Sequence, residues 1–313
     1  MVQLHEIEAA RRRIAQSVRR TPTLHAAALR EKPFQADVWL KLESLQVTGS
    51  FKARGAMNKI LSLSPEQLER GISTASGGNH GIAVAYAGHI TRVPTTVYLP
   101  RTVPPHKIDK LKRWGASVVL EGEVFDDAQK LALEVAEAKG VTYIHPFADA
   151  TIIAGQGTIG LEVLEDLPNL ETIVVAIGGG GLIAGIGAAI KAVKPDARVI
   201  GVEPTGAPTL KASLAAGGLI TLDQITTKAG TLAPRRTAQI NYDIIRETVD
   251  EIVLVSDEEM YAAADWLWFE TGMAAELSGA ASMAAVLTNK FVTRPNETLC
   301  VLVCGAGADG IAL

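Results

Sequence analysis

Apolar and polar positions along the chain follow two periods, one typical of strands and one typical of helices. The predicted strands, read from short apolar or alternating runs, are residues 38–42, 72–75, 96–99, 118–120, 173–177, 198–202 and 299–303. Helical patterns follow several of these runs, and the predicted helices include residues 108–114, 126–139 and 182–193. This repeated order of strand and helix predicts an α/β fold, with mainly parallel sheet and helices on both faces.

One further helix carries start and stop signals. Ser64 to Gln67 forms a capping-box pattern with a proline at the first helical position, and Gly71 ends the helix. The chain contains no tandem repeat and no low-complexity linker that would mark a hinge. We therefore expect two domains that interleave. The large domain comprises residues 1–69 and 148–313, and the small domain comprises residues 70–147.

The N-terminal segment could be mistaken for a targeting signal. Arginines are frequent in the first twenty residues, yet Glu6 and Glu8 argue against an organellar leader, because such leaders are poor in acids. Ile7, Ile14 and Val18 share a helical face. The segment is therefore expected to form an amphipathic first helix.

A second segment has the length of a membrane span. The eighteen residues from Ile173 to Ile190 contain no charge, which reaches the threshold for a transmembrane helix. Four consecutive glycines, Gly178 to Gly181, lie inside this run and would weaken a continuous helix. A buried strand, a turn and a buried helix explain the run better, so no membrane association is expected.

Composition narrows the class of protein. With 313 residues, of which 48% are hydrophobic, the chain can bury a large core. Its net charge of −4 offers no basic surface for a polyanion, so nucleic acid is not an expected partner. Two cysteines, Cys300 and Cys304, in a chain of this length indicate a reducing compartment, and we expect a cytoplasmic protein.

The glycine run Gly178 to Gly181 lies between a β-branched strand and a helix. Glycines allow a tight turn whose N–H groups converge, and the following helix adds its positive end, so the segment suits an anion. Gly179, Gly181 and Ala184 also fit the dinucleotide pattern G-x-G-x-x-A, and Glu203 ends the next strand where that pattern places an acid. A nicotinamide site is therefore an alternative.

Three other segments carry residues suited to catalysis or ligand binding. In Thr48 to Ala56, Lys52 lies among small residues and an aromatic one, where a desolvated amine can form a Schiff base, although most lysines are solvated. Ser76 to Gly81 offers N–H groups suited to a carboxylate, while for His80 alone a structural role is the simpler interpretation. Cys304 to Gly307 ends the last strand, where parallel sheets meet ligands.

Together these segments resemble the fold-type II pyridoxal phosphate enzymes, whose fold is that of the tryptophan synthase β chain, and within them the serine/threonine dehydratase and serine racemase group. The S-F-K-x-R-G-A, S-x-G-N-H and G-G-G-G segments, with Ile153 to Thr158, occur in the order and spacing of that family. The resemblance runs from the first helix to the final glycine turn. It implies pyridoxal 5′-phosphate as cofactor, two interleaved parallel-sheet domains and a homodimer.

The resemblance implies a role for each motif residue. Lys52 matches the catalytic lysine that carries the cofactor, with Phe51 beside it. Asn79 matches the residue bonded to the ring 3′-hydroxyl, and Cys304 matches the partner of the pyridine nitrogen. The residues that match the phosphate-holding loop and helix start are Gly178, Gly179, Gly180, Gly181 and Leu182. The residues that match the loop around the substrate carboxylate are Ser76, Gly77, Gly78 and His80.

The implied reaction is β-elimination from a 3-hydroxy amino acid such as L-threonine or L-serine, which yields a 2-oxo acid and ammonia. Lys52 is expected to take the α-proton before the β-hydroxyl leaves. A thiol at Cys304 is a weak neutral donor, so the ring should be a modest electron sink, which favours prompt loss of the β-group. The nearest alternatives are a serine racemase or a β-replacement enzyme on this fold. A nicotinamide-dependent oxidoreductase and a catalytically silent amino-acid-binding protein are more distant ones.

Several positions depart from the family pattern. Glu203 matches a family cation ligand, but Thr209 stands where metal-binding members have an acid, so no bound divalent ion is expected. Thr231 to Arg235 lacks the usual glycine-containing continuation, so an unusual substrate preference is expected. Racemase members carry a serine at the position of Gly77, so we expect elimination without racemisation. The chain ends soon after Cys304, and a regulatory amino-acid-binding domain is not expected.

Overall fold

The computed structural model describes residues 2–27 and 29–309. Its strands are β1 (Thr23–His25), β2 (Asp37–Leu42), β3 (Ile72–Ala75), β4 (Thr95–Leu99), β5 (Ser117–Leu120), β6 (Thr142–Tyr143), β7 (Thr172–Ala176), β8 (Arg198–Pro204), β9 (Glu251–Val255) and β10 (Thr298–Val303). Its α-helices are α1 (Leu4–Ile14), α2 (Lys52–Ile60), α3 (Pro65–Arg70), α4 (Asn79–Thr91), α5 (Pro105–Arg113), α6 (Phe125–Lys139), α7 (Ala150–Asp166), α8 (Gly181–Val193), α9 (Thr209–Ala215), α10 (Gln239–Thr248), α11 (Asp257–Thr271) and α12 (Leu277–Leu287). Short 3-10 turns are η1 (Glu43–Leu45), η2 (Val47–Gly49) and η3 (Gly230–Leu232).

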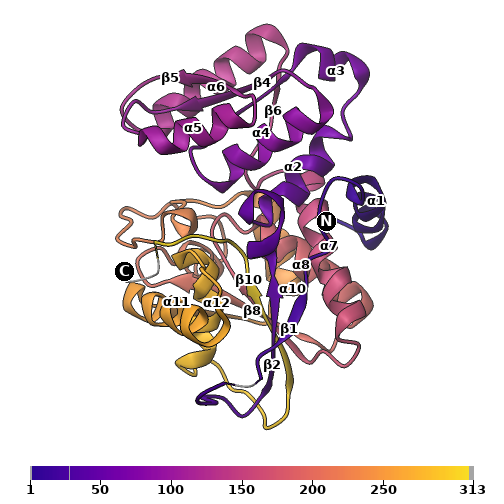
Figure 1. The fold of residues 1–313 in the computed structure, drawn as a ribbon, viewed down its shortest axis with the longest axis vertical. Coiled ribbons are helices and arrows are strands. Elements are labelled where there is room, and N and C mark those ends of the chain that lie inside the picture. The colour runs from indigo at the N-terminus through magenta and orange to yellow at the C-terminus, as the bar shows by residue number, and fades with distance from the viewer. Residues whose placement is uncertain (1, 28, 310–313) are drawn as a thin grey trace.

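The larger of two sheets has six strands in the order β1-β2-β10-β7-β8-β9. β1 runs antiparallel to β2, and all other neighbours are parallel. Figure 1 shows α11 and α12 on one side of this sheet and α1, α7, α8 and α10 on the other. Because both faces are covered, β7 is buried at every position and consists of β-branched residues and alanine.

The smaller sheet is all parallel, in the order β5-β4-β3-β6, and forms a separate lobe (Figure 1). Successive side chains of β4 point to opposite faces. Val97 and Leu99 pack with α4 and α5, whereas Tyr98 packs with α6. Ser76 to Gly78 connect the end of β3 to the start of α4. The loop with the S-x-G-N-H pattern therefore lies at the carboxyl edge of this sheet.

Helix α2, which begins at Lys52, is fixed in place by close packing against α7. A Cβ atom at Gly155 of α7 would lie 2.7 Å from the Cα of Gly55, and one at Gly157 would lie 2.8 Å from the carbonyl oxygen of Gly185 in α8. Side chains at these positions would push the three helices apart. The glycines of the 153–158 segment therefore serve helix packing.

Buried charges anchor the same helix. Two nitrogens of the Arg54 guanidinium donate to the Glu43 carboxylate at 2.9 and 2.7 Å, and Nη1 donates to Glu162 at 2.7 Å. All three side chains are almost fully buried. Removing one partner of such a network typically costs about 3–5 kcal/mol, because a charge is left buried and unpaired. The arginine of the S-F-K-x-R-G-A motif thus holds the helix that carries Lys52.

The predicted fold class is confirmed, since both sheets are largely parallel and covered by helices. Ser64 caps α3 through a capping box, and Gly71 follows it at φ 84°. The first helix ends at Ile14, so the prediction that Val18 lies on it is wrong. The run 173–190 forms β7, a turn and α8. Among the described residues, no helix is long and apolar enough to cross a membrane.

The domain boundaries stay a prediction, because the sheets alone do not fix them. Strands of the smaller sheet all lie within 70–147, which is why we keep this range as the proposed small domain. Residues 1, 28 and 310–313 of the proposed large domain lie outside the described residues.

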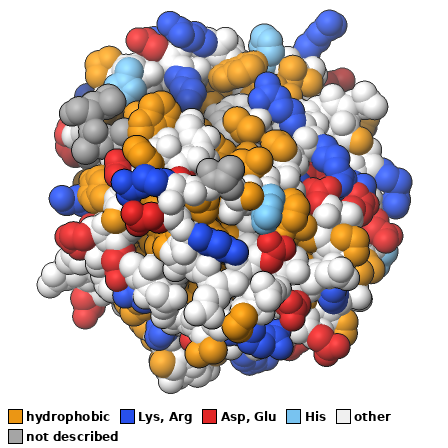
Figure 2. Space-filling view, turned by 60° about the horizontal axis from the view of Figure 1, so that its bottom comes forward, with side chains coloured by type: hydrophobic (Ala, Val, Ile, Leu, Met, Phe, Trp, Pro, Cys, Tyr) orange, Lys and Arg blue, Asp and Glu red, His pale blue; other side chains and the backbone are white. Residues whose placement is uncertain are grey.

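Figure 2 shows one face of the molecule, where acidic and basic side chains are mixed among apolar ones.

Candidate active site

The motif segments come together where strands of both sheets end. The N–H of Phe51 donates to the carbonyl of Cys304 at 3.2 Å, so the segment before α2 lies beside the end of β10. Lys52 Nζ donates to the carbonyl oxygen of Pro146 at 2.7 Å. A Cβ atom at Gly78 would lie 4.0 Å from Cγ2 of Thr231. Segments far apart in the sequence thus surround one site between the lobes.

Lys52 is the first residue of α2 and is partly buried. Burial lowers the pKa of Lys52 to about 8, although the nearby Glu276 opposes this effect. Its Nζ lies 5.1 Å from the ring centroid of Phe51. An amine with such a pKa is available as a nucleophile and as a base near neutral pH.

The glycine loop is built to leave its N–H groups unoccupied. Gly180 has φ 91°, and no side chain caps α8, which has no acid in its first turn. Thr237 Oγ1 and Asn241 Nδ2 donate to the carbonyl oxygen of Gly179 at 2.9 and 2.7 Å. These bonds hold the loop through its acceptor and leave the donors at the helix start for an external anion.

Phe147 explains why two of these glycines lack side chains. A Cβ atom at Gly179 would lie 2.2 Å from the Phe147 ring, and one at Gly181 would lie 2.7 Å from the Phe147 carbonyl oxygen. Phe147 directly follows Pro146, the partner of Lys52. Phe147 thus connects the lysine to the glycine loop, a role that no sequence pattern indicated.

The Ser76–Gly81 loop turns tightly into α4. A Cβ atom at Gly81 would lie 1.9 Å from the carbonyl oxygen of Ser76, so only glycine fits there. Ser76 Oγ accepts the N–H of Gly78 at 3.3 Å. At Gly77 a Cβ atom would meet the side chains of Leu99 and Val103 at 3.4 Å or more, which is ordinary contact. Gly77 therefore has room for a small side chain.

The ring of His80 is turned away from a ligand-binding role. It is buried, and its Nε2 lies 3.0 Å from the carbonyl oxygen of Ile144, so Nε2 carries the proton. Burial, with a smaller contribution from Lys52, lowers the pKa of His80 to about 3 and keeps the ring neutral. In this neutral ring Nδ1 is an acceptor and cannot donate to a substrate carboxylate, whereas the backbone N–H can.

Cys304 is buried at the end of β10, and its Sγ donates to the carbonyl oxygen of Ser278 at 3.3 Å. Burial raises the pKa of this thiol well above its usual range, and the charge of Glu276 acts in the same direction. The residue therefore stays a neutral thiol. Cys300, the other free cysteine, is buried within β10.

The Glu203 carboxylate is bonded to the backbone at the start of α9. Its two carboxylate oxygens accept the backbone N–H groups of Leu210 and Lys211 at 2.8 and 2.9 Å. The Thr209 hydroxyl donates to the carbonyl oxygen of Pro234 at 2.7 Å. Within the described residues, no group of three or more His, Cys, Asp or Glu side chains could hold a metal ion.

Two titratable residues near Lys52 were not predicted. His145 Nδ1 accepts the N–H groups of Phe147 and Ala148 at 3.2 and 2.8 Å, and burial lowers its pKa to about 4. Glu276 accepts a hydrogen bond from Asn79, and burial raises the pKa of its carboxyl. Neither belongs to a motif, and only the fold brings them to the lysine.

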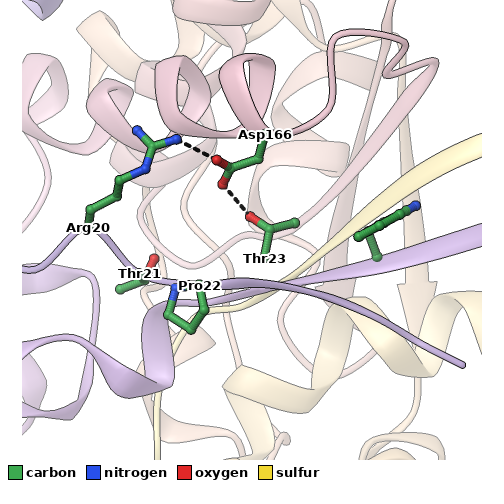
Figure 3. A pocket seen from close by; sticks show the side chains of 6 residues that line it. Arg20, Thr21, Pro22, Thr23 and Asp166 are labelled. Carbon is green, nitrogen blue, oxygen red and sulfur yellow. Dashed lines mark hydrogen bonds and ion pairs between the residues drawn. The ribbon is translucent and has the colours of Figure 1, made fainter.

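A pocket elsewhere on the molecule contains none of the motif residues. It measures about 450 Å³ and is lined by Arg20, Thr21, Pro22, Thr23, Trp39 and Asp166. Figure 3 shows that its charged groups face one another, with the Asp166 carboxylate bonded to Arg20 and to the Thr23 hydroxyl. Because these groups already satisfy one another, the pocket does not compete with the site around Lys52.

Comparison with known proteins agrees with this site. The family model described as "Pyridoxal-phosphate dependent enzyme" matches residues 14–305. The chain is 41% identical over 309 residues to an L-threonine ammonia-lyase of Thermotoga maritima, covering 99% of this chain and 76% of that protein. It is similar to the processed threonine deaminase isoform 2 of Solanum lycopersicum, with TM-score 0.93, 36% identity and coverage of 98% and 89%. It is also similar to maize serine racemase, with TM-score 0.92, 33% identity and coverage of 97% and 93%.

Proposed function

Since the chain belongs to the pyridoxal-phosphate dependent enzyme family, we propose that it converts a 3-hydroxy amino acid such as L-threonine or L-serine into a 2-oxo acid and ammonia by β-elimination. The observation that carries this proposal is the partly buried Lys52, whose amine has a pKa lowered to about 8 and lies beside a glycine loop with free donors. A dinucleotide site would use only the glycine loop and would leave this lysine unexplained.

The residues present fit pyridoxal 5′-phosphate. The donors at the start of α8 would hold its phosphate, Lys52 Nζ would attach it, and the Cys304 thiol would face the ring nitrogen. We assign Asn79 to the ring 3′-oxygen and Phe51 to the contact beside Lys52. When bound, the cofactor withdraws electrons from the α-carbon of the amino acid, which makes the α-proton acidic.

Residues of this chain then hold the substrate and move its protons. The backbone N–H groups of Ser76 to His80 would hold the substrate carboxylate at the start of α4, where the helix dipole favours an anion. Lys52 Nζ takes the α-proton, since its lowered pKa leaves part of the amine uncharged near pH 7 to 8. The β-hydroxyl departs with one proton as water, so that the α-proton and the hydroxyl are lost together, and addition of one water to the released product gives the 2-oxo acid and ammonia.

The test of this proposal is the colour and the product of the purified protein. We expect visible absorption from the bound cofactor, formation of 2-oxo acid from L-threonine or L-serine, and loss of both in Lys52→Ala. Lys59→Ala is the matched control, because Lys59 lies on the same helix but is paired with Asp149 at 2.7 Å. A colourless protein that binds a nicotinamide cofactor would overturn the proposal.

A serine racemase is the second candidate function, favoured by the similarity to maize serine racemase. Racemisation needs a second proton donor on the cofactor face opposite Lys52, and Gly77 supplies no side chain there. We expect L-serine to give pyruvate and no D-serine. Chiral chromatography of the reaction mixture measures both products. Since Gly77 has room for a Cβ atom, Gly77→Ser should fold and is where racemisation should first appear. Substantial D-serine from the parent enzyme would contradict this assignment.

We also propose a cytoplasmic homodimer. Two free buried cysteines support a reducing compartment. On α11, Trp268 and Phe269 are 46% and 65% exposed, which supports a subunit contact at this surface. Sedimentation analysis should give twice the chain mass, and Phe269→Lys should shift the protein toward the monomer. A monomeric parent protein would refute the dimer.

A further inference from the structure

Glu276, a residue outside every motif, connects the two lobes at the site. It precedes α12, which packs on the larger sheet, and its Oε1 accepts a 2.7 Å hydrogen bond from Nδ2 of Asn79 at the start of α4. The Ser278 hydroxyl donates to the same oxygen at 2.6 Å. Two donors from different lobes of the molecule therefore fix one carboxylate oxygen.

The backbone around Glu276 makes room for this carboxylate. A Cβ atom at Gly305 would lie 2.3 Å from Glu276 Oε1, and one at Gly307 would lie 2.8 Å from Glu276 Cβ. The N–H of Glu276 also donates to the carbonyl oxygen of Gly305 at 3.2 Å. The glycine turn after Cys304, which the sequence offered as a ligand-binding segment, is thus explained by Glu276.

The acceptor oxygen of Glu276 decides which way the Asn79 amide faces. An asparagine amide has one donor end and one acceptor end, and a half-turn exchanges them. Oε1 of Glu276 already accepts the Ser278 hydroxyl, so it is an acceptor toward Asn79, and Nδ2 of the amide donates to it. The opposite orientation would place two oxygens against each other. Glu276 therefore permits a single orientation of Asn79.

We infer that Glu276 is a positioning residue, which fixes the Asn79 amide so that it presents one donor–acceptor arrangement to the cofactor ring. This inference rests on the proposed function, because it requires the ring to bind at Asn79. The carboxylate is also close enough to Lys52 to raise the pKa of that amine against the effect of burial. Glu276 thus acts on both residues assigned to the ring without itself belonging to a motif.

A double-mutant cycle tests the inference on the cofactor-loaded enzyme. We expect Glu276→Ala to lower turnover roughly 10-fold, part of the ~10²-fold that a misplaced contact can cost. It should also change the visible circular dichroism of the bound cofactor in the same way as Asn79→Ala. The double variant should be within about twofold of Asn79→Ala alone, because residues acting through one contact are not additive. Multiplicative effects, or parent-like circular dichroism in Glu276→Ala, would overturn the inference.

Two further variants separate positioning from general stability. Glu276→Gln keeps the size of the side chain but can either accept or donate, so it should fall between the parent and Glu276→Ala in circular dichroism. Should Glu276→Ala not fold, Glu276→Gln carries the same cycle with Asn79→Ala. Ser278→Ala removes the other donor and leaves the Asn79 bond, so it should lower the melting temperature without the change in circular dichroism; an equal change would overturn the inference.

The parent protein distinguishes this inference from the proposed function. If the parent shows no visible absorption, the proposed function fails, and the inference fails with it. If the parent binds the cofactor and forms 2-oxo acid while Glu276 and Asn79 act independently, only the role of Glu276 fails.

Discussion

At the residue scale, chemistry that lies within a short segment could be predicted, and chemistry that depends on tertiary contact could not. Lys52 and the Gly178–Gly181 loop stand in motifs, and the structure places them in one site. Glu276 and His145 stand in no motif, because each reaches Lys52 only through the fold. His80 shows the reverse case, since it stands in a motif but its ring bonds to the backbone of Ile144.

Cys304 gives a prediction at this scale. Its Sγ donates to the carbonyl oxygen of Ser278, and the Glu276 carboxylate is close enough to raise its pKa. Cys304→Ser keeps a neutral donor, so we expect cofactor binding and a melting temperature close to the parent. Cys304→Asp would place a carboxylate against two acceptors in a buried position, which costs roughly 1–3 kcal/mol or more. A melting temperature equal to the parent in Cys304→Asp would contradict this packing.

At the element scale, strands and helices with regular patterns could be predicted to within a few residues. The predicted strand 72–75 coincides with β3. The predicted helix 126–139 is α6, which begins one residue earlier at Phe125. Elements in the segment 205–290 were missed, although β9 is an apolar run and α11 begins with a capping box at Ser256. α12 is buried almost throughout, so it shows no polar face from which a helical period could be recognised.

Glu203 gives a prediction at this scale, because it holds the start of α9. Burial raises the pKa of Glu203 to about 7, so the folded protein binds this proton more tightly than the unfolded chain does. The contribution of Glu203 to stability is therefore full below about pH 4.5 and is lost as the pH rises through 7. At about 1.4 kcal/mol per pKa unit, the loss is on the order of 3 kcal/mol.

Melting curves between pH 5 and pH 8 measure this loss. Glu203→Gln should flatten the dependence on pH, whereas Glu134→Gln, at an exposed position on α6, should leave the slope of the parent. Added Mg²⁺ should leave the melting temperature unchanged, since both oxygens of Glu203 are bonded to backbone N–H groups. If the melting temperature of Glu203→Gln depended on pH as strongly as that of the parent, or if Mg²⁺ raised the melting temperature, Glu203 would have another role.

At the scale of the whole molecule, the sequence predicted two α/β units but not how they meet. A buried apolar cluster joins them, in which Met57 of α2 packs with Val84 of α4. Two polar contacts add to it, Asn79 with Glu276 and Lys52 with the Pro146 carbonyl. Neither contact has a signal in either segment alone. The site therefore depends on the relative placement of two sheets, which strand and helix patterns do not encode.

Because both sheets contribute to the site, a bound cofactor should stabilise the whole molecule against unfolding. A ligand held by residues from both sheets binds only the folded protein, and at 100 times its Kd it adds about 2.7 kcal/mol. Removing the cofactor should therefore lower the melting temperature by roughly 5 °C or more, since about 2–4 °C corresponds to each kcal/mol in proteins approaching this size. The melting temperature should rise again with added pyridoxal 5′-phosphate, in one calorimetric transition, because each sheet supplies part of the site. If one lobe unfolded in a separate transition whose temperature did not change with added cofactor, the whole site would lie on the other lobe.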